Sequence, residues 1–346
     1  MQDTFGRTID YLRISVTEAC NFRCIYCAPN GYAAPQKSPL TVEEIERVVR
    51  AAVALGISKI RLTGGEPLLR RDIVEIVRAV ASLEGVRDLA LTTNGFLLAR
   101  LARDLANAGL NRVNISLDTL RRERFARITG IRTISPTGTS DSQTEMQTGE
   151  SVRQDAFDAV WAGIHAAEEA QLAPVKINVV VMRGVNDDEF ADFARLTLTH
   201  PWHVRFIELM PVGANDVARE FFARHFISAD ELIARLPELT RSDSPRGNGH
   251  ARTYCLPGSR MTVGFITPAS EHFCNACNRI RVTAQGAVCA CLFGSREMDL
   301  RQVLCEHVNE TALQELLARA IGAKPEQHPI GDDFVLRVKA MSKIGG

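Results

Sequence analysis

The stretch at residues 11–27, YLRISVTEACNFRCIYC, decides the fold, because an apolar strand leads directly into three closely spaced cysteines. Three residues separate Cys20 from Cys24, and two separate Cys24 from Cys27. Thiolates this close are poor disulfide partners for one another, but they can surround one compact metal centre. A four-iron cluster needs four ligands, so three cysteines leave one iron open. The alternatives are a structural zinc site or three buried thiols, and the spacing, with Tyr26 beside the last cysteine, favours the cluster.

Length and charge are typical of a cytosolic enzyme. The chain has 346 residues, which suggests about two domains and a core that needs no disulfides. Lys plus Arg and Asp plus Glu both number 41, which argues against a dedicated nucleic-acid binder or a polybasic membrane protein. No stretch approaches the ~20 apolar residues of a membrane span, and the first residues lack a signal-peptide pattern. Nine cysteines in such a chain indicate metal or redox chemistry.

Apolar and β-branched runs alternate with helical patterns up to residue 209, which is typical of βα units around a parallel sheet. Six units predict an incomplete (β/α)6 barrel with its site at the carboxyl ends of the strands. A doubly wound sheet fits the pattern almost as well. We expect strands at residues 11–16, 57–63, 88–93, 112–117, 175–182 and 204–209, and helices at 42–55, 73–83, 97–108, 156–170 and 188–198.

Polar side chains follow one face of several of these strands, because residues two apart share a face. A small closed barrel packs its lumen with apolar side chains, so polar faces predict a lumen wide enough for a polar ligand. The alternative is a half-exposed sheet with one solvated face. The polar sets are Arg13, Ser15 and Thr17, then Asn114, Ser116 and Asp118, then Lys176 and Asn178, and the opposite faces carry Leu12, Ile14, Val16, Val113, Ile115 and Leu117.

The pattern changes beyond residue 209 and predicts a smaller α+β domain. We expect helices at 229–236, 298–304 and 310–320, a loop at 242–249, and short strands at 252–256, 261–267, 279–283 and 287–292. The predicted organisation is a barrel at 1–225, a second domain at 226–322 and a tail at 323–346. Within the barrel, residues 131–154 are rich in Ser, Thr, Gly and Gln, so we expect a flexible insertion.

A second cysteine group lies in the smaller domain. It consists of Cys274, Cys277 and Cys291, with Cys289 just before the last. The spacing alone allows a zinc ribbon with four cysteine ligands or an iron–sulfur site with an open iron.

Basic residues are expected near both cysteine groups. Arg279 and Arg281 lie two apart, so both point the same way in an extended strand. Guanidinium groups bind phosphate oxygens in a bidentate manner. Together with Arg13, Arg61 and Lys176 on barrel strands, they predict a cationic pocket in a neutral protein. The alternative is a set of surface cations paired with carboxylates.

Motifs along the whole chain resemble a known family. The first cysteine spacing with Tyr26, together with GGEP at residues 64–67, resembles the radical S-adenosylmethionine superfamily. Stretches from residue 6 to residue 346 are similar to the GTP 3′,8-cyclase family, among them IRLTGGEPLLRRD, LTTNG, NISLDTL, FIELMPVG and CNACNRIRVT with the terminal MSKIGG. The pairing of CNACNRIRVT with a terminal Gly-Gly is the most specific part of the resemblance.

The resemblance implies two [4Fe–4S] clusters in one site. The first would be held by Cys20, Cys24 and Cys27 and chelate S-adenosylmethionine, and the second by Cys274, Cys277 and Cys291 and contact guanine. The matching S-adenosylmethionine positions are Tyr26, Gly65, Ser116 and Met210. The matching GTP positions are Arg13, Arg61, Thr92, Lys176, Arg279, Ile280 and Arg281. Catalytic roles would fall to Arg13, Arg279, Arg281 and the terminal Gly345 and Gly346.

The implied reaction is a radical cyclisation of GTP by a lyase that starts molybdenum cofactor biosynthesis. A radical made from S-adenosylmethionine would take the hydrogen from C3′, and C3′ would then attack C8 of guanine. The product would be (8S)-3′,8-cyclo-7,8-dihydroguanosine 5′-triphosphate. The resemblance also implies a low-potential electron donor, cyclic pyranopterin monophosphate synthase as the downstream enzyme, a cytoplasmic location, and a monomer or homodimer without nucleic-acid or membrane partners.

The chain departs from the family pattern at three places. Residues 131–154 are longer than usual, Cys289 is an extra thiol, and Ala-Pro follows Cys27 where Met-Pro or Leu-Pro is commoner. Cys289 leaves the third ligand of the second cluster open between itself and Cys291. Two alternatives from other classes are a peptide-modifying radical enzyme with an auxiliary cluster and an inactive iron–sulfur or zinc-binding scaffold.

Overall fold

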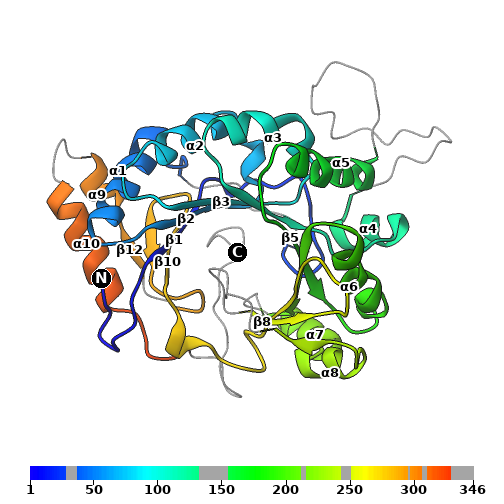
Figure 1. Ribbon diagram of the computed structural model, residues 1–346. Coiled ribbons are helices and arrows are strands. Elements are labelled where there is room, and N and C mark those ends of the chain that lie inside the picture. Colours follow the sequence, from blue (N-terminus) through cyan, green and yellow to red (C-terminus); the bar gives the residue numbers. More distant parts are fainter. Residues whose placement is uncertain are drawn as a thin grey trace.

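The computed structural model describes residues 1–28, 37–131, 155–211, 216–242, 251–294, 297–305 and 310–328. Over these residues the chain forms one curved sheet of twelve strands, with helices along its outer side (Figure 1). The strand order is β12-β11-β10-β1-β2-β3-β4-β5-β6-β9-β8-β7, so the two ends of the sheet do not pair and the barrel is open.

The elements have the following bounds. The strands are β1 Tyr11–Ser15, β2 Lys59–Thr63, β3 Asp88–Thr93, β4 Arg112–Ser116, β5 Val175–Val181, β6 Trp202–Glu208, β7 Thr240–Arg241, β8 Arg252–Cys255, β9 Val263–Ile266, β10 Arg279–Val282, β11 Ala287–Cys289 and β12 Glu297–Asp299. The α-helices are α1 Val42–Ala54, α2 Ile73–Ala81, α3 Leu98–Asn107, α4 Arg122–Thr129, α5 Ala156–Glu169, α6 Phe190–Thr199, α7 Asp216–His225, α8 Ala229–Ala234, α9 Arg301–Cys305 and α10 Glu310–Gly322. The 3-10 turns are η1 Pro67–Leu69, η2 Asp187–Glu189 and η3 Cys274–Ala276.

Strands β1 to β6 are parallel and neighbour one another in chain order. A doubly wound sheet would reverse its strand order at a switch point, so that alternative is wrong. The predicted incomplete barrel is confirmed. The carboxyl ends of its strands converge on one side of the sheet, where the loops after β1, β2 and β6 meet.

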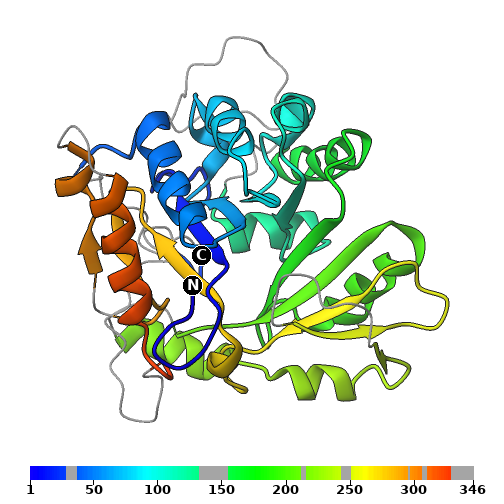
Figure 2. The same cartoon turned by 60° about the vertical axis from the view of Figure 1, so that its left-hand side comes forward.

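The C-terminal strands continue this sheet at both edges. Strand β10 pairs in parallel with β1, and β9 pairs in parallel with β6. Figure 2 shows the yellow β8–β9 hairpin beside the green strands β5 and β6, and the orange helix α10 beside α1. The predicted boundary near residue 225 therefore lies between segments that share one sheet, and two separate domains remain a prediction.

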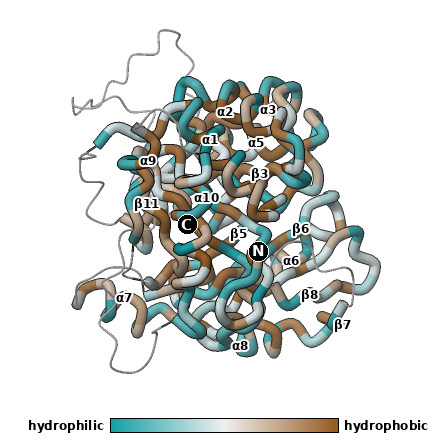
Figure 3. Tube along the Cα trace, turned by 90° about the vertical axis from the view of Figure 1, so that its left-hand side faces the viewer, coloured by the Kyte–Doolittle hydropathy of each residue, from teal (hydrophilic) through white to brown (hydrophobic). Residues whose placement is uncertain are grey.

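The apolar faces of the strands pack against the helices. Leu12, Ile14, Val113 and Ile115 are completely buried in one core that also takes in the inner faces of α1, α2, α3 and α5. Hydrophobic residues recur along α2, α3, α5 and β3 in Figure 3. Because the apolar face is covered by helices, the polar face must line the lumen, and the half-exposed sheet is the wrong alternative.

The first residues of helix α1 determine where this helix begins. The side chain of its N-cap, Thr41, accepts a hydrogen bond from the Glu44 amide, and the Thr41 amide donates to Glu44 Oε2. This capping box satisfies two amides that a helix start leaves open. At the other end of the chain, α10 packs on α1, and Arg47 of α1 donates to the carbonyl of Leu304 at 2.9 Å.

Three local expectations are wrong or incomplete. Helices α4 and α7 carry weak apolar patterns and were not expected from the sequence. Residues 297–299 form strand β12 instead of the start of a helix, because pairing with β11 outweighs local preference.

Several expectations fall outside the described residues. These are residues 132–154 of the flexible insertion, residues 243–249 of the expected loop, and the tail beyond residue 328, including Gly345 and Gly346. Among the described helices, none has both the length and the apolar character that a membrane span requires.

Candidate active site

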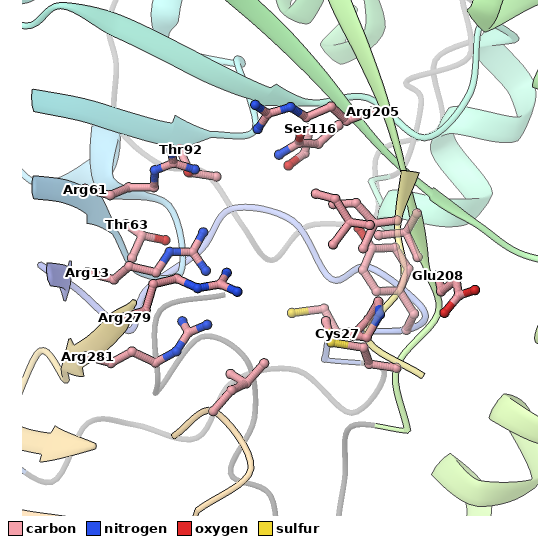
Figure 4. Close-up of a pocket in the computed structure, with 18 of the residues that line it drawn as sticks. Arg13, Cys27, Arg61, Thr63, Thr92, Ser116, Arg205, Glu208, Arg279 and Arg281 are labelled. Carbon is pink, nitrogen blue, oxygen red and sulfur yellow. The ribbon is translucent and has the colours of Figure 1, made fainter. Parts of the chain in front are cut away.

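A cavity of about 330 Å³ lies in the lumen of the barrel, lined by residues from both ends of its strands. Both cysteine groups line it, although they lie at opposite ends of the sequence. In the parallel pair of β10 with β1, Cys277 precedes β10 and the first cysteine loop follows β1, so the two groups line the cavity from opposite ends of these strands. The cavity also contains polar side chains from β1, β2, β3, β4, β5 and β6 (Figure 4).

The first cysteine loop is held by backbone contacts to neighbouring elements. The amides of Arg23 and Ile25 donate to the carbonyls of Thr129 and Ile128 at 2.7 and 3.0 Å. Phe22 is buried in edge contacts with the rings of Phe96 and Phe125. These contacts fix the loop between α4 and the turn before α3, and its thiols line the cavity.

Tyr26 is oriented by a buried acid. Its hydroxyl donates to Asp118 Oδ2 at 2.8 Å, and the Val180 amide donates to Asp118 Oδ1 at 2.8 Å. Burial raises the pKa of Asp118 to about 6 despite these two hydrogen bonds. Burial and the charge of Asp118 also raise the pKa of Tyr26, so its phenol stays protonated and keeps donating.

Glu66 of the GGEP motif joins two strand ends. Its carboxylate accepts hydrogen bonds from the Leu68 amide, the Thr93 hydroxyl and the Asn94 amide, at 2.9, 2.7 and 2.6 Å. Burial raises its pKa to about 7. The amides of Gly65 and Glu66 donate to the carbonyls of Thr17 and Ala19 at 2.8 and 2.7 Å, so this motif also fixes the first cysteine loop.

The second cysteine group surrounds another part of the cavity. Cys274 and Cys277 lie at η3, and Cys291 follows β11. Burial acts to raise the pKa of Cys277, but the charges of Lys324 and Arg279 outweigh it and lower the pKa to about 7. Burial raises the pKa of Cys274. A thiol that ionises readily is a better metal ligand, which suits Cys277 to coordination.

Three arginines form a row across neighbouring strands. Arg281 of β10 pairs in register with Arg13 of β1, and Arg13 pairs with Arg61 of β2. Figure 4 shows these side chains, with Arg279, pointing into the cavity from the side opposite Cys27. Burial and the charge of Arg281 lower the pKa of Arg13 to about 9, and burial lowers the pKa of Arg281 to about 10. A row of buried cations at this spacing needs a multiply charged anion.

Buried polar atoms in the cavity lining also indicate an anionic ligand. Arg13 Nε, Arg61 Nε, Thr92 Oγ1 and Asn178 Oδ1 have no hydrogen-bond partner among the described residues. Leaving a buried donor or acceptor unsatisfied costs about 1–3 kcal/mol. A ligand carrying several oxygen acceptors, such as a triphosphate, would satisfy the arginine donors.

Most of the predicted site residues line this cavity. They are Cys20, Cys24, Cys27, Cys274, Cys277 and Cys291, the S-adenosylmethionine positions Tyr26, Gly65, Ser116 and Met210, and the GTP positions Arg13, Arg61, Thr92, Arg279 and Arg281. Lys176 and Ile280 are not among the lining residues. Ile280 is completely buried in the core, and burial, with the charge of Arg205, lowers the pKa of Lys176 to about 6.

Sequence reasoning missed Arg205, Lys324 and Asp118 as site residues. Arg205 lies on β6 and lines the cavity, and burial, with the charge of Arg61, lowers its pKa to about 9. Alternation along β6 could have identified it, since residues 203, 205 and 207 share the face opposite the buried Trp202, Val204 and Phe206. Asp118 belonged to a predicted polar face. No sequence signal points to Lys324.

Each cysteine group offers three thiols to the cavity. Iron–sulfur clusters are held by cysteine thiolates, and three thiolates leave one iron of a four-iron cluster open. The donor chemistry of both groups therefore fits [4Fe–4S] clusters.

Two family models match this chain, one in each half. The Radical SAM superfamily matches residues 14–197, and Molybdenum Cofactor Synthesis C matches residues 202–330. The chain is 46% identical to a GTP 3′,8-cyclase from Heliobacterium modesticaldum and 45% identical to one from Desulforamulus reducens, covering 100% of each chain. It therefore belongs to the GTP 3′,8-cyclase family of radical S-adenosylmethionine enzymes.

Solved structures agree on the fold. Streptococcus suis SuiB bound to S-adenosylmethionine matches with a TM-score of 0.57 and 14% identity, covering 91% of this chain and 68% of that one. The structure described as native anSMEcpe with bound AdoMet matches with a TM-score of 0.52 and 16% identity, covering 91% of this chain and 81% of that one. At such identities the likeness shows the radical S-adenosylmethionine fold alone.

The extra thiol, Cys289, allows a test of the second ligand set. Its side chain is buried in β11 and donates to Glu297 Oε1 at 3.4 Å, and it is not among the residues that line the cavity, whereas Cys291 is. We expect Cys289→Ala to keep both clusters and Cys291→Ala to lose the second. Iron per chain and cluster absorbance after anaerobic reconstitution measure this. Loss of the cluster in Cys289→Ala, with retention in Cys291→Ala, would reverse the assignment.

Proposed function

We propose that this cavity binds GTP between two [4Fe–4S] clusters and S-adenosylmethionine. The chain cyclises GTP to (8S)-3′,8-cyclo-7,8-dihydroguanosine 5′-triphosphate, the first step of molybdenum cofactor biosynthesis. The observation that supports this best is that both cysteine groups and a row of buried arginines line one cavity.

The residues present fit these groups. Cys20, Cys24 and Cys27 would hold the first cluster, and Cys274, Cys277 and Cys291 the second, each with an open iron. When bound, the first cluster and S-adenosylmethionine supply the one-electron chemistry that breaks the C3′–H bond of the ribose. Tyr26, Gly65, Ser116 and Met210 would hold S-adenosylmethionine beside the first cysteine group.

The arginines orient the substrate. The triphosphate would be bound by Arg13, Arg61, Arg205 and Arg281. Arg279 would contact the substrate near the second cysteine group. With the phosphates fixed on one side and guanine directed towards the second cysteine group, C3′ and C8 are held at close approach. Such orientation supplies much of the barrier reduction in a reaction within one molecule.

The apolar part of the wall excludes water. The apolar residues of the lining include Ile207, Ile266, Phe273, Leu292 and Phe293. A carbon radical takes hydrogen from any nearby donor, so a dry cavity protects the reaction.

We also propose the partners, the location and the oligomeric state of the chain. A low-potential donor supplies the electron, and cyclic pyranopterin monophosphate synthase consumes the product. The chain acts in the cytoplasm as a monomer or homodimer. Catalytic roles for Gly345 and Gly346, and GTP contacts by Lys176 and Ile280, remain part of the proposal.

The two alternatives lack support. A peptide-modifying enzyme shares the fold, but a peptide does not require a row of buried arginines, and the relatives of 45–46% identity are GTP 3′,8-cyclases. An inactive scaffold does not explain buried donors that face an open cavity.

Arg205→Ala tests the role assigned to the arginines. A charge-assisted hydrogen bond contributes about 1.5–3 kcal/mol, so GTP affinity should fall about ten- to a hundredfold. Guanosine affinity should change far less. Equilibrium binding to reconstituted protein without S-adenosylmethionine measures both. Arg195→Ala on the exposed side of α6 is the matched control and should change neither. Equal losses for GTP and guanosine would show that Arg205 does not bind phosphate.

A further inference from the structure

Lys324 follows helix α10 and reaches into the second cysteine site from outside every recognised motif. Its side chain is buried and lines the cavity. The ammonium donates to the carbonyl of Arg279 at 2.8 Å and to the carbonyl of Ala290 at 2.8 Å. Both partners are neutral, so they satisfy donors but do not neutralise the buried charge.

These two carbonyls belong to two different ligand segments. Arg279 lies two residues after Cys277, and Ala290 directly precedes Cys291. One lysine therefore joins the start of β10 to the turn after β11. Charged hydrogen bonds at 2.8 Å are among the stronger contacts available inside a protein. Lys324 therefore adds a side-chain link between the two segments, beside the backbone pairing of β10 with β11.

Arg7 anchors the segment that carries this lysine. Its guanidinium donates to the carbonyls of Pro325 and Glu326 at 2.7 and 2.9 Å. It also donates to the carbonyl of Cys274 at 2.8 Å, and a buried ion pair with Asp3 holds it in place. The His328 amide donates to Cys274 Sγ at 3.5 Å. Residues 324–328 and Arg7 together therefore contact all three ligand segments.

We propose that Lys324 is a positioning residue of the second cluster. It links the Cys277 and Cys291 segments through their backbone carbonyls and brings a positive charge to the second cysteine group. Reduction makes a cluster more negative, so a nearby positive charge stabilises the reduced form and raises the reduction potential. This proposal rests on the second cluster proposed above.

The test compares Lys324→Met, Lys324→Gln and Lys324→Arg with wild type. Lys37→Met is the matched control, because that lysine is exposed and lies outside the cavity lining. Three quantities are measured after anaerobic reconstitution: iron per chain, the rate at which a chelator removes iron, and the midpoint potential of the second cluster by electron paramagnetic resonance. Cleavage of S-adenosylmethionine reports independently on the first cluster, and melting of the apo-protein reports on folding.

Lys324→Met should lose iron from the second cluster about tenfold faster, as expected for one charged hydrogen bond. Its midpoint potential should become more negative, with normal cleavage of S-adenosylmethionine. Lys324→Gln should also shift the potential, because it removes the charge while keeping a donor. Lys324→Arg should restore both quantities towards wild type, and Lys37→Met should match wild type.

Wild-type iron loss and potential in Lys324→Met would overturn the proposal. Equal defects in Lys324→Met and Lys324→Arg would also overturn it, since that result points to packing instead of charge. A lower melting temperature of apo Lys324→Met, with an unchanged potential in Lys324→Gln, would also overturn the proposal, because that result shows a role in folding and no effect of the charge on the cluster. Wild-type protein holding only about four irons would instead refute the second cluster itself.

Discussion

Cys20→Ser should lose S-adenosylmethionine cleavage altogether, whereas Cys274→Ser should keep cleavage and lose the cyclised product. The reason is that the two cysteine groups are held by separate contacts. The first loop is fixed by α4, Phe96 and the GGEP motif, and the second by β10, β11 and residues 324–328. Losing one ligand should therefore open one cluster site without displacing the other.

Iron counting and product analysis after anaerobic reconstitution measure this. Wild type should hold about eight irons and Cys274→Ser about four. Cys255→Ser is the matched control, because Cys255 is free and is not among the residues that line the cavity. Loss of S-adenosylmethionine cleavage in Cys274→Ser, or stoichiometric zinc at the second group of active enzyme, would contradict the account.

Gly65→Ala should reduce S-adenosylmethionine cleavage by about a hundredfold or more, because a displacement of ~1 Å at a reacting centre can cost that much. A Cβ at Gly65 would lie 2.3 Å from the Ala19 carbonyl oxygen and 2.6 Å from that of Glu18. Both obstacles are backbone atoms of the first cysteine loop, so the loop that carries Cys20 must move. The rate of 5′-deoxyadenosine formation and the iron content of the first site measure the effect.

Gly322→Ala is the matched control for this substitution. Apart from its chain neighbours and its own helix backbone, no atom of the described residues lies within 4 Å of the Cβ position at Gly322, which ends α10. Its activity should equal that of wild type, and its stability should hold or rise slightly, because alanine restricts the unfolded chain more than glycine. Normal cleavage by Gly65→Ala would show that the close approach of the two loops is not required.

The barrel could be predicted because its pattern is local and regular. The expected strands and helices before residue 209 match the structure within a few residues, apart from α4. The polar faces also identified the lumen, since Arg13, Ser116 and Asn178 line the cavity while Leu12 and Val113 are buried. Alternation along a strand carries this information without any knowledge of the partner strands.

The spacing of the cysteines in the sequence could not show that both cysteine groups line one cavity. This arrangement depends on the parallel pairing of β10 with β1, between segments far apart in the sequence. Neither strand encodes its partner in its own pattern. The resemblance to GTP 3′,8-cyclases supplied that link, and the geometry of the cavity agrees with it. Lys324 was missed for the same reason, because its role follows from where α10 ends in space.

Alternation along a strand could not decide whether Cys289 or Cys291 is the third ligand of the second cluster. Residues two apart share a face only while the strand continues. Strand β11 ends at Cys289, so Cys291 lies in the following turn and the rule no longer relates the two. Sequence alone therefore left both thiols as candidates, whereas the structure places only Cys291 at the cavity.

The most direct test follows the hydrogen atom at C3′. Reconstituted wild-type protein is given S-adenosylmethionine, a reductant and GTP carrying deuterium at C3′, and the products are analysed by mass spectrometry. The account predicts deuterium in 5′-deoxyadenosine and a cyclised isomer of GTP that has lost the C3′ label. Unlabelled 5′-deoxyadenosine together with unchanged GTP, from protein holding both clusters, would contradict it.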